Sequence, residues 1–248
     1  MVEAIAQFFR DLYEKTGLNF NVFYDAYEFD RFVSGAVTSL QLMCFVIVIS
    51  LILGLIGATL QRSKITAVRI GVEAYVQVFR NTPPMVQLLF FYFGLGSLTP
   101  QVDMGGYSQP LVSSFAWAVI ALGAFGGAYN VEIFRAGIEA VPKATLEACE
   151  SLSFSRWQIN RHVLLPLALR TSFPSLVSNI ISLAKTTSLA YVISVPEMTY
   201  VLNQVWSDNV NVPEMIVVLF VFYTAVIAII AKLAARLERR LKVPGFGQ

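Results

Sequence analysis

Long runs without a charged residue dominate the chain. Residues 32–61, 81–102 and 104–131 contain no charged side chain; nearer the C-terminus, Lys185 is the single charged residue of 171–196, and 215–231 contain none. A helix that crosses a membrane needs about 17–25 mostly apolar residues, and these runs lack the alternation of barrel strands. We therefore predict an all-α, polytopic membrane protein. Five transmembrane helices are expected, near Ser34–Leu60, Gly71–Leu98, Leu111–Arg135, Thr171–Val195 and Val212–Ala235.

Lysine and arginine are unevenly distributed between these spans. They occur after the first span, between the third and fourth, and in the C-terminal tail, whereas Thr99–Pro110 and Pro196–Asn211 contain none. Basic loops face the cytoplasm, so we predict a cytoplasmic C-terminus and, with five spans, an N-terminus outside. The predicted parts are an extracytoplasmic segment 1–33, a transmembrane domain 34–242 with a cytoplasmic loop at about 137–170, and a cytoplasmic tail 243–248. Within the first segment, Ala4–Leu12 is expected to form an interfacial or subunit-packing helix.

The composition supports a membrane protein and argues against most soluble classes. The chain is 56% hydrophobic and 14% charged, whereas soluble domains carry about 25% charge. A net charge of +2 is too small to indicate nucleic-acid binding. With one histidine, no zinc-like cysteine spacing and no aspartate in the spans, no catalytic or metal-binding constellation is expected.

The segment between the third and fourth spans has the pattern of a helix-turn-helix. Pro142 suits the first turn of one helix, and Ser155 with Gln158 forms a capping box for a second. Pro166 is expected to end or kink that second helix. The first helix is amphipathic, and no other segment supplies an obvious partner for its apolar face. This indicates a docking element; a helix lying on lipid headgroups is the alternative.

The same segment resembles a known family. Glu147-Ala148-Cys149, then Ser153, Val163 and Leu165-Pro166 match the spacing of the "EAA" loop of bacterial ABC importer permeases, whose pattern is Glu-Ala-Ala, Gly and Ile-x-Leu-Pro. Ser153 replaces the glycine, which is the largest departure. A left-handed turn there costs a non-glycine residue about 1–2 kcal/mol. The resemblance implies that this loop docks on a separate ATPase subunit and that Glu147 transmits its closure.

Further segments narrow the resemblance to the polar amino acid permeases of the histidine/glutamine type. They are EAYVQVFRNTPPMVQLLFFYFG from Glu73, GAYNVEIFRAGIEAVPKA from Gly127 and LAKTTSLAYVI from Leu183. The resemblance implies the type I ABC importer permease fold in a bacterial inner membrane. It also implies an ATP-binding subunit, a second permease subunit (identical or homologous) and an extracytoplasmic solute-binding protein.

Nothing in the chain indicates that it hydrolyses ATP. There is no GxxxxGK[ST] phosphate loop, and the group Gly123, Gly126 and Gly127 lies within an apolar span, where small residues favour close helix packing. We therefore expect a transport subunit rather than an enzyme, without a cofactor of its own, while ATP and Mg are used by the partner ATPase. A gradient-driven secondary transporter or a channel subunit is the alternative, although no internal repeat supports it.

Two polar clusters at membrane depth are candidates for the substrate pathway. In the second span, Arg80, Asn81 and Thr82 precede two prolines that break the helix, and Gln87 lies one turn further. A kink needed only for packing is the alternative.

The second cluster lies in the fourth span and comprises Ser182, Lys185, Thr186 and Thr187. We hypothesise that Arg80 and Lys185 attract the substrate carboxylate, which favours acidic or amide amino acids such as glutamate, aspartate or glutamine. Alternatively, both cations bind backbone carbonyls. Glu132 is expected to pair with Arg135 one turn away or with the loop.

Overall fold

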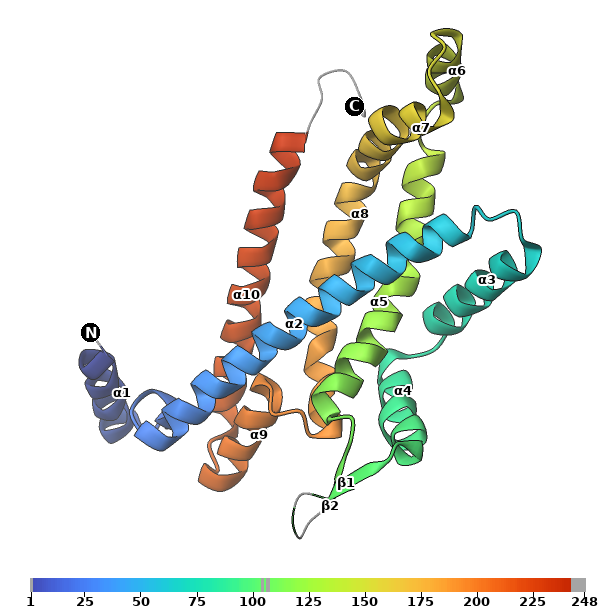
Figure 1. Cartoon of the computed structure of the whole chain (residues 1–248). Coiled ribbons are helices and arrows are strands. Elements are labelled where there is room, and N and C mark those ends of the chain that lie inside the picture. The colour runs from blue at the N-terminus through green and yellow to red at the C-terminus, as the bar shows by residue number, and fades with distance from the viewer. Residues whose placement is uncertain (1, 104, 106–107, 242–248) are drawn as a thin grey trace.

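The computed structural model describes residues 2–103, 105 and 108–241, which are mostly helical (Figure 1). The predicted tail 243–248 lies outside the described residues. The α-helices are α1 (Val2–Thr16), α2 (Ala26–Leu60), α3 (Thr66–Asn81), α4 (Pro84–Leu89), α5 (Ser114–Glu139), α6 (Lys143–Ser151), α7 (Arg156–Ile159), α8 (Leu165–Thr186), α9 (Met198–Asn209) and α10 (Val212–Leu241). Shorter helical turns are η1 (Asn21–Phe23), η2 (Phe90–Leu95), η3 (Gly96–Leu98), η4 (Asn160–Leu164) and η5 (Thr187–Ile193).

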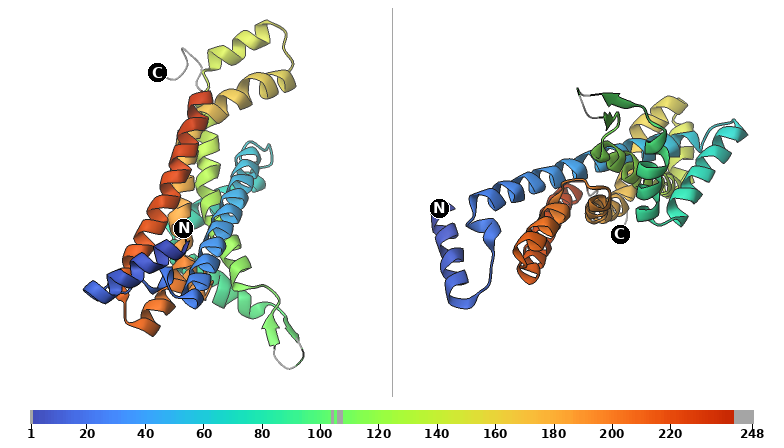
Figure 2. Two further views of the ribbon diagram at one scale, coloured as in Figure 1. Left: turned by 90° about the vertical axis from the view of Figure 1, so that its left-hand side faces the viewer. Right: turned by 90° about the horizontal axis from the view of Figure 1, so that it is seen from below.

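The strands β1 (Gln101–Asp103) and β2 (Ser108–Pro110) form an antiparallel hairpin at one end of the helical bundle. Helices α6 and α7 project beyond the opposite end (Figures 1 and 2). These two ends are called the α9 end and the α6 end below, because α9 lies near the hairpin end.

Four helical segments are long and apolar enough to cross a membrane: Ala26–Leu60, Ser114–Glu139, Arg156–Ile193 and Val212–Arg239. They correspond to four of the five expected spans and confirm the all-α membrane fold. The expected second span is not one helix. It is divided into α3 and the shorter apolar segment Pro84–Leu98, because Pro83 and Pro84 interrupt the backbone hydrogen bonding there.

Glycines allow α2, α5 and α8 to pack closely at the centre of the bundle. A Cβ on Gly123 would lie 2.7 Å from Ile49 Cγ2, and one on Gly127 would lie 2.8 Å from Leu53 Cβ. On the other side of α5, a Cβ on Gly126 would lie 2.5 Å from Leu183 Cδ1. The packing interpretation of this glycine group is therefore confirmed.

A buried polar chain joins the same three helices and was not foreseen from the sequence. The Asn130 side chain on α5 donates a hydrogen bond to Ser50 Oγ on α2 (3.1 Å) and accepts one from Asn179 Nδ2 on α8 (2.8 Å). Because unpaired polar groups are costly at membrane depth, these bonds favour one register of the three helices.

At the α9 end, α1 forms the expected helix but extends to Thr16. It lies across the direction of the bundle (Figure 2). Its Phe9 ring stacks on Phe23 with centroids 4.7 Å apart, whereas Phe8 is 62% exposed. Helix α2 also starts earlier than the expected span, at Ala26, because the Asp25 side chain accepts a hydrogen bond from the Glu28 N–H and caps it.

Candidate functional site

A break between two half-helices forms the centre of the candidate pathway. Helix α3 ends at Asn81, and α4 begins at Pro84 after an extended turn. The buried Gln87 side chain closes this turn: its Nε2 donates hydrogen bonds to the carbonyls of Phe79 (2.8 Å) and Thr82 (3.0 Å), and contacts Thr82 Oγ1. Gln87 thereby satisfies carbonyls that the prolines leave without helical partners.

Replacing Gln87 with leucine is therefore expected to destabilise the break. The carbonyls of Phe79 and Thr82 would lose their donor in a buried environment, at a cost of about 1–3 kcal/mol. We expect a lower thermal midpoint and reduced transport. Gln77→Leu, at an exposed position on α3, is the control for polarity alone, and equal midpoints for the two variants would contradict this role.

A hydrogen-bonded polar ladder runs along α3 toward the break. Asn81 Nδ2 donates to Gln77 Oε1 (3.0 Å), and Gln77 Nε2 donates to Glu73 Oε1 (2.6 Å). All three side chains are exposed. Of these three residues, only Asn81 was identified from the sequence. The spacing of four residues would have shown that Glu73 and Gln77 lie on the same helical face as Asn81.

Arg80 is compensated by a carboxylate, contrary to the hypothesis of a free positive zone. Its guanidinium lies 3.7 Å from Glu132 Oε2 and over the Tyr129 ring, 5.3 Å from the centroid. Glu132 also forms the predicted pair with Arg135, at 2.6 Å, and Arg135 pairs with Glu139 at 3.0 Å. The network joins α3 to α5, so of the two proposed cations only Lys185 lacks an ion pair among the described residues.

One face of α8 carries exposed polar side chains through an otherwise apolar spanning segment. They are Ser175, Ser178, Ser182 and Lys185, spaced three or four residues apart, and together they are called the α8 stripe. Within the described part of the chain, Lys185 has no ion pair or side-chain hydrogen bond. Thr186 donates to the Ser182 carbonyl, whereas Thr187 is buried and donates to the Ala184 carbonyl, so Thr187 lies off the stripe.

The two clusters are joined through α4, the half-helix that follows the break. Helix α4 packs against η5, the turn that follows Lys185 on α8. No hydrogen bond or ion pair joins Lys185 to Arg80 or Gln87 among the described residues. The structure thus brings together Arg80, Asn81, Thr82 and Gln87 around the break, and it places Ser182 and Lys185 on a separate surface.

The predicted helix-turn-helix is present at the α6 end. Helix α6 carries Glu147, Ala148 and Cys149, and the following turn contains Ser153 with φ of +61°. Ser153 therefore has the left-handed conformation expected at the glycine position of the family pattern. The capping box of Ser155 and Gln158 is also confirmed, with Ser155 Oγ accepting from the Gln158 N–H (3.3 Å).

Of the two effects expected of Pro166, an end or a kink of the helix, the end is wrong. One helical segment continues from Arg156 to Ile193, with the π-turn η4 directly before Leu165 and Pro166. Pro166 lacks the N–H that would bond to the preceding turn, and the wider π-turn η4 provides room for its ring within this continuous segment.

The apolar residues of the loop divide into a buried and an exposed set. Leu146 packs against a cluster formed by Val141, Leu164 and Ala168, so α6 does have a partner within the chain, contrary to expectation. Leu152 is 71% exposed and Trp157 is 63% exposed. With half-exposed Phe154 these residues form an apolar tip, called the loop tip, that makes the loop suitable for docking.

Comparison with known proteins agrees with this architecture. Residues 47–243 match the family of binding-protein-dependent transport system inner membrane components. The chain is 31% identical to the probable amino-acid permease protein YxeN of Bacillus subtilis over 79% of this chain and 85% of YxeN. It is 34% identical to the glutamine transport system permease protein GlnP of Escherichia coli K12, over 68% of this chain and 74% of GlnP.

Solved structures show the same fold. An amino acid ABC transporter crystallised with histidines matches with a TM-score of 0.75 and 29% identity, over 85% of this chain and 94% of the other. The inward-facing methionine transporter MetNI matches with a TM-score of 0.70 at 18% identity, over 88% of this chain and 100% of the other, and supports the fold alone.

These features define a polytopic transport subunit of an amino acid importer. The chain belongs to the family of binding-protein-dependent transport system inner membrane components, and it is a polar amino acid ABC permease subunit. Membership of this family places the chain in the inner membrane. It also implies that the chain functions together with an ATP-binding subunit and a solute-binding protein.

Proposed function

We propose that this chain imports polar L-amino acids as one of two permease subunits, with the α8 stripe lining the pathway. The single observation that carries this proposal is the unpaired Lys185 within a stripe of serines on a spanning helix. Such a surface is costly against lipid, so it is expected to face water, substrate or a second permease subunit. The second subunit, identical or homologous, would complete the pathway opposite the stripe.

Acidic or amide amino acids are the substrates we favour. Lys185 offers a positive charge without a partner, which suits the α-carboxylate of every amino acid and a side-chain carboxylate in addition. Among the relatives, GlnP is named for glutamine and ArtQ of Bacillus subtilis for arginine. This spread supports an amino acid substrate without selecting one side chain. The compensation of Arg80 by Glu132 means that Lys185 alone supports the acidic preference.

We place the α6 end in the cytoplasm and the α1, α9 and hairpin elements outside. The basic residues support this orientation, since Lys143 and Arg156 belong to α6 and α7 and Arg62 and Lys64 lie in the loop that joins α2 to α3. In this arrangement, a separate ATPase chain with ATP and Mg would dock on the loop tip. Closure of the ATPases would move α5 and α8 through the helix-turn-helix, because α6 and α7 connect these two helices.

Lys185→Met tests the proposal. The importer is isolated with its native partners, reconstituted in liposomes with ATP inside, and assayed with labelled glutamate, glutamine, arginine and histidine. We expect ATP-dependent uptake by the wild type and a loss of about tenfold or more in Lys185→Met, because a charged hydrogen bond to the substrate is removed.

Lys64→Met in the loop after α2 is the matched control, and its uptake is expected to equal that of the wild type. Uptake by Lys185→Met that matches the wild type in rate and affinity would contradict the role of Lys185. Wild-type uptake that needs an ion gradient and not ATP would instead support the gradient-driven alternative.

A further inference from the structure

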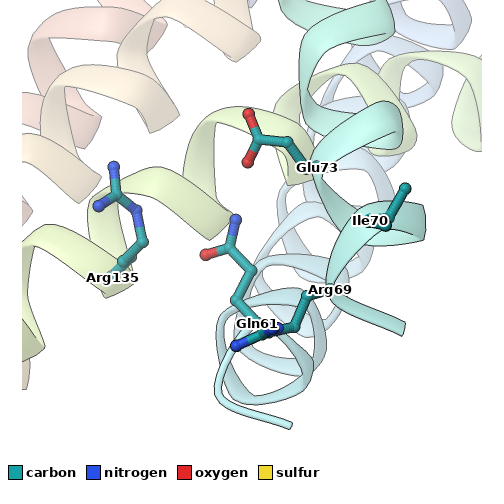
Figure 3. A pocket seen from close by; sticks show the side chains of 5 residues that line it. All are labelled: Gln61, Arg69, Ile70, Glu73 and Arg135. Carbon is teal, nitrogen blue, oxygen red and sulfur yellow. The ribbon is translucent and has the colours of Figure 1, made fainter. Parts of the chain in front are cut away.

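A polar hollow of about 450 Å³ lies at the α6 end of the bundle, away from the α8 stripe. It is lined by the C-terminal end of α2, the first turns of α3 and the last part of α5, through Gln61, Arg69, Ile70, Glu73 and Arg135 (Figure 3). Its size is within the range of small-molecule sites. We call it the α3 hollow.

Two opposite charges on α3 face this hollow without neutralising each other. Arg69 and Glu73 are four residues apart, a spacing that often gives an ion pair on a helix. Instead, Arg69 Nη2 donates to Thr66 Oγ1 (3.3 Å), and Glu73 accepts from Gln77. Among the described residues, neither side chain has an ion pair. Arg135 differs, because Glu132 and Glu139 both compensate it.

The opposite wall contributes an acceptor without a donor. Gln61 Oε1 is buried and has no hydrogen-bond partner within the described structure. Figure 3 shows the Gln61 amide, the Glu73 carboxylate and the Arg135 guanidinium directed toward one space. That oxygen is closed to the solvent, so the groups of this space that a bound molecule can reach are the charged ones on α3.

We propose that the α3 hollow binds the zwitterion of a free α-amino acid. A carboxylate near Arg69 and an ammonium group near Glu73 would match the two unpaired charges. This inference rests on the proposed function, which supplies the amino acid and places the hollow on the cytoplasmic side.

The position of the hollow indicates what such binding would do. Glu73 is the last member of the ladder that runs from the break through Asn81 and Gln77. An amino acid leaving the break would follow this polar face of α3 and reach the hollow before bulk solvent. Accumulated product bound there would hold α3 against α2 and α5 and slow the next transport cycle.

The test is inhibition of uptake from the luminal side of liposomes. The importer with its native partners is reconstituted with its binding protein outside and ATP inside. The lumen also contains an unlabelled amino acid at a series of increasing concentrations. This amino acid is the one among glutamate, glutamine and arginine that the importer transports best. We expect uptake to fall with luminal amino acid. The half-inhibitory concentration is expected to rise about tenfold or more in Glu73→Gln and in Arg69→Gln, with each variant normalised to its own uninhibited rate.

Arg62→Gln is the control, since Arg62 is exposed in the adjoining loop and does not line the hollow. Its half-inhibitory concentration is expected to stay within about twofold of the wild type. The N-acetyl derivative lacks the ammonium group and the α-amide lacks the carboxylate, so neither is expected to inhibit at the concentrations where the amino acid does. If Glu73→Gln transports too slowly to measure, Arg69→Gln on the exposed surface of α3 decides the result.

Three outcomes would overturn the proposal. Wild-type uptake without luminal inhibition would exclude the site, as would inhibition unchanged in both variants. A phosphatidylethanolamine headgroup carries the same pair of charges, so the liposomes contain phosphatidylcholine and phosphatidylglycerol. Loss of the inhibition on adding phosphatidylethanolamine would assign the hollow to lipid. Absence of any amino acid uptake by the wild type would contradict the proposed function itself, which separates that failure from failure of the hollow.

Discussion

Replacing Leu152 with aspartate is expected to abolish ATP-driven uptake and to release the ATPase subunit from the permease. Leu152 is 71% exposed in the loop tip, so the change leaves the packing of this chain intact. In a docked complex the leucine would be covered. A buried leucine contributes about 1.5–3 kcal/mol, and a carboxylate in its place adds the cost of desolvating a charge. Together these effects correspond to a loss of affinity of about 100-fold or more.

The measurement is co-isolation of the ATPase with tagged permease in mild detergent, followed by uptake in liposomes. Leu111→Asp is the matched control, because Leu111 is 61% exposed but lies next to the hairpin at the opposite end of the chain's bundle. We expect Leu111→Asp to retain the ATPase. Retention of the ATPase and of uptake by Leu152→Asp would show that docking does not use the loop tip.

The helix-turn-helix was predictable because its signals are local. The capping box of Ser155 and Gln158 and the left-handed Ser153 depend on residues within three or four positions of one another. The effect of Pro166 was not predictable in the same way. A proline normally ends a helix, and only the preceding π-turn, which has no clear sequence pattern, allows the helix to continue.

The candidate pathway was predictable only in part, for a related physical reason. The two prolines and the polar residues around them identify the break between α3 and α4 from sequence alone. The partners of those residues come from other helices: Glu132 on α5 reaches Arg80 on α3, and Asn130 joins Ser50 and Asn179. Such pairs depend on the register of packed helices, which the spacing of polar residues along one helix does not determine.

Two glycines in helices differ in whether that register depends on them. Gly54 of α2 faces α5, where an added Cβ would lie 3.0 Å from the backbone carbonyl carbon of Asn130 and 3.2 Å from its Cα. Gly71 of α3 has no atom within 4 Å of an added Cβ. We expect Gly54→Ala to lower the thermal midpoint of the purified permease by several degrees. The reason is that overpacking against a backbone costs about 1–3 kcal/mol, at roughly 2–4 °C per kcal/mol.

Gly71→Ala is expected to leave the midpoint unchanged or to raise it, since alanine is favoured over glycine in a helix by about 1 kcal/mol. The two variants make the same chemical change, so a difference between them measures the close approach of α2 to α5 and not helix propensity. Displacing Asn130 would also strain its hydrogen bonds to Ser50 and Asn179. If the two variants had equal midpoints, α2 could move away from α5 without breaking the hydrogen bonds that join Asn130 to Ser50 and Asn179. The three helices would then lack a fixed register.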